Sequence, residues 1–434
     1  MLIAGQSGDQ LLTKPEQLDG SATSATAQNK RPASRLHVPQ PPHRENGETS
    51  FGNPKLSPAG ATRKPDVASK AVDLRDMAFE LVRVLDDDGK ALGPWNPGLS
   101  PDQLREGLRK MLLLRVFDDR MHKGQRQGKT SFYMQATGEE AITVAQTMAL
   151  RRDDMCFPTY RCQGILITRD YPLVDMMNQI YSNAKDPLKG HQLPILYSAR
   201  DYGFFSASGN VGTQICQSVG WAMGCAYRGT DSIAAGWIGE GSTAEGDFHN
   251  ALVFASVYRA PVILNVVNNQ WAISSNKCFS GVGDSTFASR AIGFDMPGIK
   301  VDANDFLATY AVTQWAAERA RKGLGATLIE LYTYRAGAHS TSDDPTRYRP
   351  AKEVWPLGDP VDRLTKHLKA MGEWSDERNA ALIEELTAQV RTAQKESEAI
   401  GTLGQSKPSV SVMFDDVYKE PDWRLRQQRQ SLGV

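Results

Sequence analysis

A carboxylate between two glycines and a later pair of asparagines are the residues of this chain best suited to chemistry. Glu240 is the centre of a Gly-Glu-Gly tripeptide (239–241), and the pair Asn268-Asn269 follows after 26 further residues, 242–267. Carboxylate and amide oxygens are the ligands that a hard cation prefers. Glu240 and Asn269 could therefore hold such a cation between them, with magnesium and a diphosphate as the expected occupants.

The segments around these residues predict how they are positioned. Residues 233–238 and 262–267 are apolar runs of strand length, and one helix fits between them. This order implies parallel strands with a right-handed crossover, and open sheets of this kind bind ligands at the carboxyl ends of their strands. Ser242 and Glu245 have the S-x-x-E spacing of a capping box, which predicts that the helix begins there. Its free backbone N–H groups would favour a phosphate.

Three further side chains could act on a bound group. Tyr160 and Arg161 lie on a turn between two apolar segments. A hydroxyl beside a multidentate guanidinium suits a diphosphate, and a surface ion pair is the alternative. His339 lies in a polar loop just beyond an apolar strand, 326–335, at the edge where Glu240 is expected. We expect a catalytic role for this histidine, with a structural role as the alternative.

Several charged residues favour structural explanations. Arg115 and Asp118 share one face of a predicted helix, so we expect them to be solvated or interfacial. Glu139 and Glu140 fall in the first turn of another helix, where carboxylates complement the helix dipole. A functional role for these two acids is the alternative.

Composition bounds the class of protein. The chain has 434 residues and a formal net charge of zero, which gives no argument for binding to nucleic acid or to an acidic membrane surface. No apolar run approaches the roughly 18 residues that a transmembrane helix requires, and we see no secretion signal at the start. The five cysteines include no C-x-x-C pair, so buried free thiols are expected rather than metal ligands or disulfides.

Three regions of the chain differ in character. Residues 1–72 are rich in Pro, Ser, Gln and Gly and hold too little apolar surface to order alone, which predicts a flexible or partner-packed arm. Residues 73–360 predict an α/β domain, with a mostly parallel sheet flanked by helices. Residues 361–434 predict a helical region followed by a docking tail.

These motifs resemble those of a known family. The Gly-Glu-Gly tripeptide and the asparagine pair look like the thiamine diphosphate motif, with Glu where Asp is common. Together with NNQWAIS (268–274) and YRAGAHSTSDDPTRYR (334–349), they make residues 73–434 similar to alpha subunits of the decarboxylase component of 2-oxo acid dehydrogenases, the branched-chain type in particular. The resemblance implies the thiamine diphosphate-binding fold.

The resemblance also implies a role for individual residues. In that family magnesium is coordinated by the positions that match Glu240, Asn269 and the backbone carbonyl of Trp271. The positions that contact thiamine diphosphate match Tyr160, Arg161, Gly241, Ser242 and His339. A potassium-binding turn of some relatives matches Ser208, Asn210, Thr213 and Gln214, although Gly209-Asn210 departs from the Ser-Pro found there. Ser340 matches a serine whose phosphorylation inactivates some relatives.

The implied activity is that of a 3-methyl-2-oxobutanoate dehydrogenase (2-methylpropanoyl-transferring). It is the oxidative decarboxylation of branched-chain 2-oxo acids in branched-chain amino acid catabolism, with transfer of the acyl group to a lipoyl arm of an acyltransferase core. Only one cofactor-binding strand–helix–strand unit is found, so a beta subunit would supply the second half in an alpha2-beta2 heterotetramer. The location would be the bacterial cytoplasm, or the mitochondrial matrix of a eukaryote. Dehydrogenation of pyruvate or acetoin, and a non-catalytic paralogue, are the alternatives.

Overall fold

The computed structural model describes residues 39, 56–283, 285–350, 355–405, 409–415 and 418–434. Most of the predicted arm, 1–38 and 40–55, lies outside the described residues. The rest of it, 56–72, belongs to the folded part, since Thr62 is buried and the Pro65 carbonyl accepts a hydrogen bond from Trp315 Nε1 at 2.9 Å. The folded part of the chain therefore begins before residue 73.

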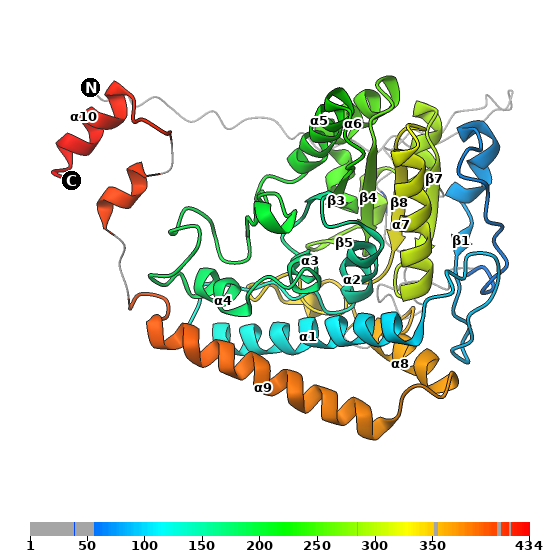
Figure 1. Ribbon diagram of the computed structural model, residues 1–434, viewed down its shortest axis with the longest axis horizontal. Coiled ribbons are helices and arrows are strands. Elements are labelled where there is room, and N and C mark those ends of the chain that lie inside the picture. The colour runs from blue at the N-terminus through cyan, green and yellow to red at the C-terminus, as the bar shows by residue number, and fades with distance from the viewer. Residues whose placement is uncertain (1–38, 40–55, 284, 351–354, 406–408, 416–417) are drawn as a thin grey trace, which may run out of the picture. The chain divides into compact units, whose positions relative to one another are not determined.

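A six-stranded sheet organises this folded part, in the order β1-β7-β8-β4-β3-β2 (Figure 1). Each pairing between neighbouring strands of the described sheet is parallel, which confirms the predicted α/β class. A two-stranded antiparallel hairpin, β5-β6, follows β4. The strands are β1 (Leu81–Val82), β2 (Met155–Phe157), β3 (Ala234–Gly239), β4 (Val262–Asn268), β5 (Trp271–Ala272), β6 (Ser275–Asn276), β7 (Gly298–Asp302) and β8 (Thr327–Tyr332).

Helices cover the sheet and extend from one side of it (Figure 1). The α-helices are α1 (Pro101–Arg126), α2 (Glu140–Ala149), α3 (Gln163–Thr168), α4 (Leu173–Tyr181), α5 (Thr213–Arg228), α6 (Gly246–Val257), α7 (Phe306–Arg321), α8 (Pro360–Ala370), α9 (Asp376–Ile400) and α10 (Trp423–Ser431). The 3₁₀ helices are η1 (Ala71–Ala78), η2 (Arg200–Tyr202), η3 (Glu240–Ala244), η4 (Lys277–Ser280), η5 (Ala288–Phe294), η6 (Pro345–Arg347) and η7 (Val410–Phe414).

The central strand β4 shows why the sheet is covered on both faces. All seven of its residues are buried. Ile263 and Val267 belong to the apolar cluster that includes α2 and α7, whereas Leu264 and Val266 belong to a second cluster with α5 and α6. Alternate side chains of a strand point to opposite faces. A continuous apolar run therefore requires helices on both sides, as is typical of parallel sheets.

Helix α1 begins at a complete capping box. The Ser100 hydroxyl accepts from the backbone N–H of Gln103, and the Gln103 side chain accepts from the N–H of Ser100. The prediction that charges of this helix are solvated or interfacial is wrong for Asp118, which is fully buried within the chain. Its carboxylate accepts from the Tyr133 hydroxyl and the Ala136 N–H, both at 2.6 Å, and these contacts replace water.

The predicted start of the helix after Glu240 is also wrong. Residues 240–244 form η3, and α6 begins at Gly246 with no side-chain cap from Glu245. The Thr243 hydroxyl donates to the Glu240 carbonyl at 2.6 Å and holds this tighter turn. Ser242 therefore lies before the helix and not at its N-cap.

The C-terminal helices share the core of the α/β domain. Helix α9 packs along α1 and α4, as Figure 1 shows for α1, and its residues Leu386 and Val390 join the cluster on the α2 side of the sheet. Helix α10 has no buried residue. The division of the chain at residue 360 stays a prediction.

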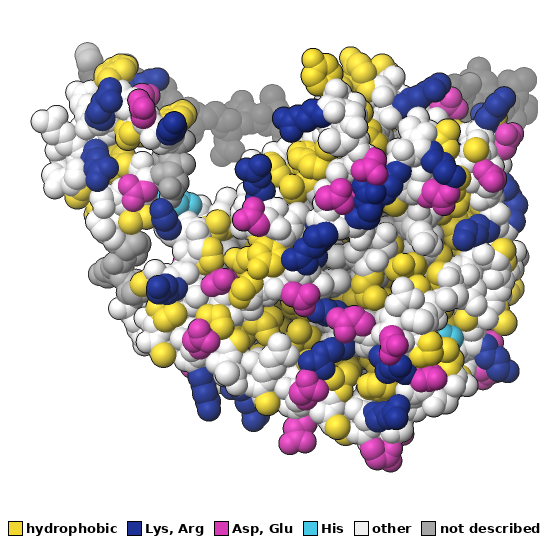
Figure 2. All heavy atoms as spheres, in the orientation of Figure 1, with side chains coloured by type: hydrophobic (Ala, Val, Ile, Leu, Met, Phe, Trp, Pro, Cys, Tyr) yellow, Lys and Arg dark blue, Asp and Glu magenta, His cyan; other side chains and the backbone are white. Residues whose placement is uncertain are grey.

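One part of the surface is apolar. Val253, Phe254 and Val257 of α6, with Tyr258 directly after it, are exposed. Figure 2 shows apolar side chains gathered where α5 and α6 lie, whereas acidic and basic side chains are interspersed over the rest of that face.

None of the helices built from described residues is long and apolar enough to cross a membrane.

Candidate active site at the carboxyl edge of the sheet

The predicted site residues follow strands that end side by side. β3, β4 and β8 are neighbours in register. Glu240 directly follows β3, Asn269 directly follows β4, and His339 lies in the loop after β8. Parallel sheets of this kind bind ligands at this edge.

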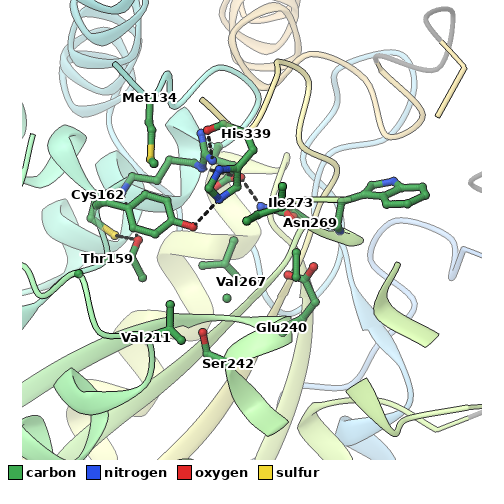
Figure 3. Close-up of a pocket in the computed structure, with 18 of the residues that line it drawn as sticks. Met134, Thr159, Cys162, Val211, Glu240, Ser242, Val267, Asn269, Ile273 and His339 are labelled. Carbon is green, nitrogen blue, oxygen red and sulfur yellow. Dashed lines mark hydrogen bonds and ion pairs between the residues drawn. The ribbon is translucent and has the colours of Figure 1, made fainter. Parts of the chain in front are cut away.

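A cavity of about 620 Å³ lies at this edge. Figure 3 shows Glu240, Ser242, Asn269 and His339 around one space, although they come from three separate segments. Asn210 and Thr213 are the predicted site residues that do not line it. Those that do are Tyr160, Arg161, Ser208, Gln214, Glu240, Gly241, Ser242, Asn269, Trp271 and His339.

The carboxylate expected to hold a cation has a free oxygen. Glu240 is 1% exposed, and its Oε1 has no hydrogen-bond partner among the described residues. Burial raises the pKa of Glu240 to about 7, against the lowering effect of the N–H groups of Glu240 and Asn269. A buried carboxylate without a partner is costly, and a bound cation would remove that cost.

The other two predicted cation ligands have partners within the protein. The Asn269 Nδ2 donates to Glu139 Oε1 at 2.7 Å, which leaves the amide oxygen for other contacts, among them the Trp271 N–H at 3.3 Å. The carbonyl of Trp271 accepts from Arg335 Nη1 at 2.8 Å. A carbonyl oxygen has two lone pairs, so this contact leaves one for a cation.

We tested whether these residues fit the expected magnesium. No group of three or more His, Cys, Asp or Glu side chains among the described residues could hold a metal ion. The predicted set has a single carboxylate, with an amide and a backbone carbonyl completing it. Oxygen donors of these kinds suit magnesium, which keeps several waters and often takes ligands from a bound phosphate. The residues fit the ion, and magnesium itself stays a proposal.

Tyr160 and His339 contact each other across the cavity. The Tyr160 hydroxyl lies 2.9 Å from His339 Nε2, and the two rings are 5.5 Å apart at 66°. The backbone N–H of His339 donates to Asp343 Oδ2 at 2.7 Å, and Tyr348 donates to the same oxygen at 2.6 Å. The histidine therefore has a fixed position although its loop contains no strand.

The surroundings of His339 shift its titration away from neutrality. Burial, together with the cations Arg161 and Arg335, lowers the pKa of His339 to about 4, while Asp343 opposes this shift. The imidazole is therefore neutral at pH 7. A neutral imidazole has one donor and one acceptor nitrogen, so His339 can hold a proton at one nitrogen and accept one at the other.

Arg161 is buried and makes contacts within the protein. Its Nη2 donates to the His339 carbonyl at 3.0 Å, its Nη1 donates to the Gln135 carbonyl, and its Nε lies 3.6 Å from Glu139 Oε1. The surface ion pair considered from the sequence is therefore wrong. Contact with a diphosphate stays a prediction, and the guanidinium already fixes the backbone of the histidine loop.

Gly241 allows a close approach of two segments. A Cβ at this position would come within 2.5 Å of the Ala272 Cβ, whereas a Cβ at Gly239 would meet nothing within 4 Å. The hairpin that carries Trp271 therefore packs directly against the turn after β3. In that hairpin region Gln270 and Ile273 have positive φ values, 76° and 53°. The backbone is strained at Ile273 in particular, because β-branched residues rarely adopt this conformation.

The predicted potassium turn is only partly at the cavity. Ser208 accepts from the Asn210 N–H at 3.1 Å, and Thr213 donates to the Asn210 carbonyl at 3.1 Å. Gln214 donates to the Trp237 carbonyl at 2.8 Å, and its buried Oε1 has no partner among the described residues. Potassium binding stays a prediction.

The two adjacent acids of the helix start have different surroundings. Glu139 lines the cavity and contacts Asn269 and Arg161. Glu140 pairs with Arg115 at 2.7 Å and does not line the cavity. The sequence left structural and functional roles open for both acids, because a GEE tripeptide carries no signal for which acid faces a ligand.

The sequence also gave no sign of the apolar wall of the cavity. Phe132, Met134, Ile142, Leu193 and Val211 come from four segments, and all of them line it. The four segments share no helical or strand periodicity, so a sequence pattern could not have identified these residues as one wall.

A partly apolar cavity at the carboxyl edge of a parallel sheet is typical of α/β proteins that bind a cofactor or another small ligand. The chain belongs to the Dehydrogenase E1 component family, which matches residues 108–405. This family is thiamine diphosphate-dependent.

Curated relatives in bacteria and in mitochondria are similar to most of the chain. The 2-oxoisovalerate dehydrogenase subunit alpha of Pseudomonas aeruginosa is 58% identical over 403 residues, which are 92% of this chain and 98% of that protein. The mitochondrial 2-oxoisovalerate dehydrogenase subunit alpha of Mus musculus is 37% identical and covers 81% of this chain and 79% of its own. The mitochondrial 2-oxoisovalerate dehydrogenase subunit alpha 2 of Arabidopsis thaliana is 37% identical, over 80% of this chain and 73% of that protein.

Proposed function

We propose that this chain is the alpha subunit of a decarboxylase component that acts on branched-chain 2-oxo acids. The observation that carries the proposal is the buried Glu240, which lines the same cavity as Asn269 and His339 and whose Oε1 has no hydrogen-bond partner among the described residues. The relatives named for 2-oxoisovalerate support the substrate class. Thiamine diphosphate, when bound, supplies an electron sink for decarboxylation.

The residues of this chain would bind and orient the reacting groups. Glu240, Asn269 and the Trp271 carbonyl would hold magnesium. Gly241 and Ser242, which both line the cavity, would lie at the diphosphate. These assignments follow from the resemblance and from the shared cavity.

Tyr160 and His339 would manage protons. Their 2.9 Å contact fixes the position of His339 Nε2, and the neutral ring can accept a proton from the substrate side or return one. Arg161 keeps the loop in place through the His339 carbonyl. The apolar wall that includes Phe132 and Met134 would limit the access of water to the reacting groups.

We propose a beta subunit and a lipoyl acyltransferase core as partners. A family of E1 components with an alpha subunit implies a beta subunit in general, and the alpha2-beta2 state is the finer proposal. The exposed apolar residues Phe254, Val257 and Tyr258 support burial of this surface in an assembly. The bacterial cytoplasm or the mitochondrial matrix is the corresponding location, since relatives of both kinds exist.

The test is oxidation of 2-oxo acids by the chain co-purified with its beta subunit, using an artificial electron acceptor. We expect turnover that requires thiamine diphosphate and magnesium, with a higher kcat/KM for 3-methyl-2-oxobutanoate than for pyruvate. Turnover with pyruvate or acetoin alone would keep the site and change the substrate. A complex that binds the cofactor without turnover would indicate a non-catalytic paralogue.

A further inference from the structure

Glu139 contacts both Asn269, on the expected cation side of the cavity, and Arg161, on the expected diphosphate side. Its Oε1 accepts from Asn269 Nδ2 at 2.7 Å and lies 3.6 Å from Arg161 Nε. All three side chains are buried. Glu139 is thus placed to act on the site through its neighbours.

The contact with Asn269 determines which end of the amide is available. The oxygen and nitrogen of an asparagine amide are nearly equal in size but opposite in hydrogen bonding. A carboxylate only accepts, so the Nδ2 group must point at Glu139, and the amide oxygen takes the other direction. The Trp271 N–H, at 3.3 Å from Oδ1, supports the same orientation. A hard cation takes oxygen and not the amide nitrogen.

We infer that Glu139 is a positioning residue that holds the Asn269 amide with its oxygen toward the divalent cation beside Glu240. The inference rests on the proposed function, since it assigns a further residue to the same site. Outer partners of metal ligands typically contribute 10–100-fold to metal affinity.

Glu140 provides a matched comparison. It is the next residue and is equally buried, but its carboxylate accepts from Arg115 and from the Gly138 N–H at 2.8 Å. It is not part of the cavity wall. A change at Glu140 therefore perturbs a buried acid of the same helix start without touching Asn269.

The experiment titrates magnesium chloride into the complex of full-length chain and beta subunit, at fixed thiamine diphosphate, with calorimetric detection. We expect Glu139→Ala to weaken magnesium affinity by about 10–100-fold, with kcat returning to within a few-fold of wild type at saturating magnesium. Glu140→Gln should keep the wild-type affinity. In an Asn269→Ala background, Glu139→Ala should change the affinity by less than about 2-fold, since coupled residues are non-additive.

Two results would overturn the inference. The first is a Glu139→Ala complex whose magnesium affinity is within about 2-fold of wild type. The second is an equal loss of magnesium affinity when Glu139→Ala is introduced into the wild-type and Asn269→Ala backgrounds, which would indicate an effect of charge and not of positioning. If Glu139→Ala does not assemble, Glu139→Gln, which keeps an acceptor oxygen, should show a smaller loss under the same criteria. A wild-type complex that binds no magnesium would instead overturn the proposed function.

Discussion

Two buried glutamates, Glu140 at the start of α2 and Glu240 at the end of β3, have the same burial and different partners. Each is at most 1% exposed, and burial raises the pKa of each to about 7. Glu140 is satisfied on both oxygens, by Arg115 and by the Gly138 N–H. Glu240 has one oxygen without a partner among the described residues.

The difference in hydrogen bonding separates an acid that the protein satisfies from an acid with an unsatisfied oxygen. Native proteins satisfy nearly all buried polar groups, so an exception requires an explanation. At Glu140 the cation is the guanidinium of Arg115 in α1. Arg115 also bonds to Asp359, the residue directly before α8, so it links α1, α2 and the start of α8. At Glu240 no described residue bonds to Oε1, in agreement with the cation proposed at this acid. This contrast predicts that changes at the two sites affect different properties.

The largest expected effect is the loss of activity in Glu240→Gln. We expect the activity of the complex to fall about 100-fold or more, which corresponds to about 3 kcal/mol of transition-state stabilisation. Stability should be unchanged or higher, because the variant removes a buried carboxyl group with an unsatisfied oxygen, which costs about 1–3 kcal/mol. Oxidation of 3-methyl-2-oxobutanoate and urea unfolding measure the two properties. Unchanged activity would remove Glu240 from the site.

Arg115→Met should have the opposite profile. It leaves Glu140 without its cation, so we expect a loss of about 3 kcal/mol in the free energy of unfolding, with wild-type activity in the folded fraction. Removing one partner of a buried ion pair usually costs about 3–5 kcal/mol, and the lower end applies here because the Arg115 side chain is 25% exposed. Arg109→Met is the control, since its partner Glu385 is exposed, and it should cost at most about 1 kcal/mol. Equal losses in both variants would contradict the comparison.

Tyr160→Phe sharpens the contrast on the cavity side. The variant loses the hydroxyl that contacts His339 Nε2, and one hydrogen bond of this kind contributes about 1 kcal/mol. We expect kcat to fall roughly 5- to 10-fold. Tyr197→Phe is the control, because that buried hydroxyl has no partner among the described residues. A wild-type kcat in Tyr160→Phe would exclude a role for the contact.

The smallest expected effect is a pH dependence from His339. Its folded pKa of about 4 lies below the ordinary value of 6.5, so the unfolded chain binds a proton that the folded chain does not between these values. Stability should therefore decrease as the pH falls from 6.5 toward 4, by at most about 1.4 kcal/mol per pH unit. Unfolding midpoints of wild type and His339→Gln, compared at pH 8 and 5.5, measure this. Wild type should lose more stability than the variant.

Much of the fold could be predicted because it depends on local patterns. The apolar runs 233–238 and 262–267 predicted β3 and β4 to within one residue at each end. Contacts between distant segments could not be predicted in this way. The burial of Asp118 depends on Tyr133, Ala136 and Gln163, and the start of α6 depends on the η3 turn rather than on the S-x-x-E spacing.

By itself, the sequence predicted the parallel sheet, and it proposed Glu240, Asn269, Tyr160, Arg161 and His339 as site residues, all of which line one cavity. These followed from residue types at strand ends and from a motif with a regular spacing. The tertiary structure alone decided their protonation and their partners: that His339 is neutral, that Glu240 keeps a free oxygen, and that of two adjacent acids Glu139 faces the cavity while Glu140 pairs with Arg115. The physical reason is that pKa values and hydrogen-bond partners depend on burial and on charges brought together from distant parts of the chain, which no local pattern contains.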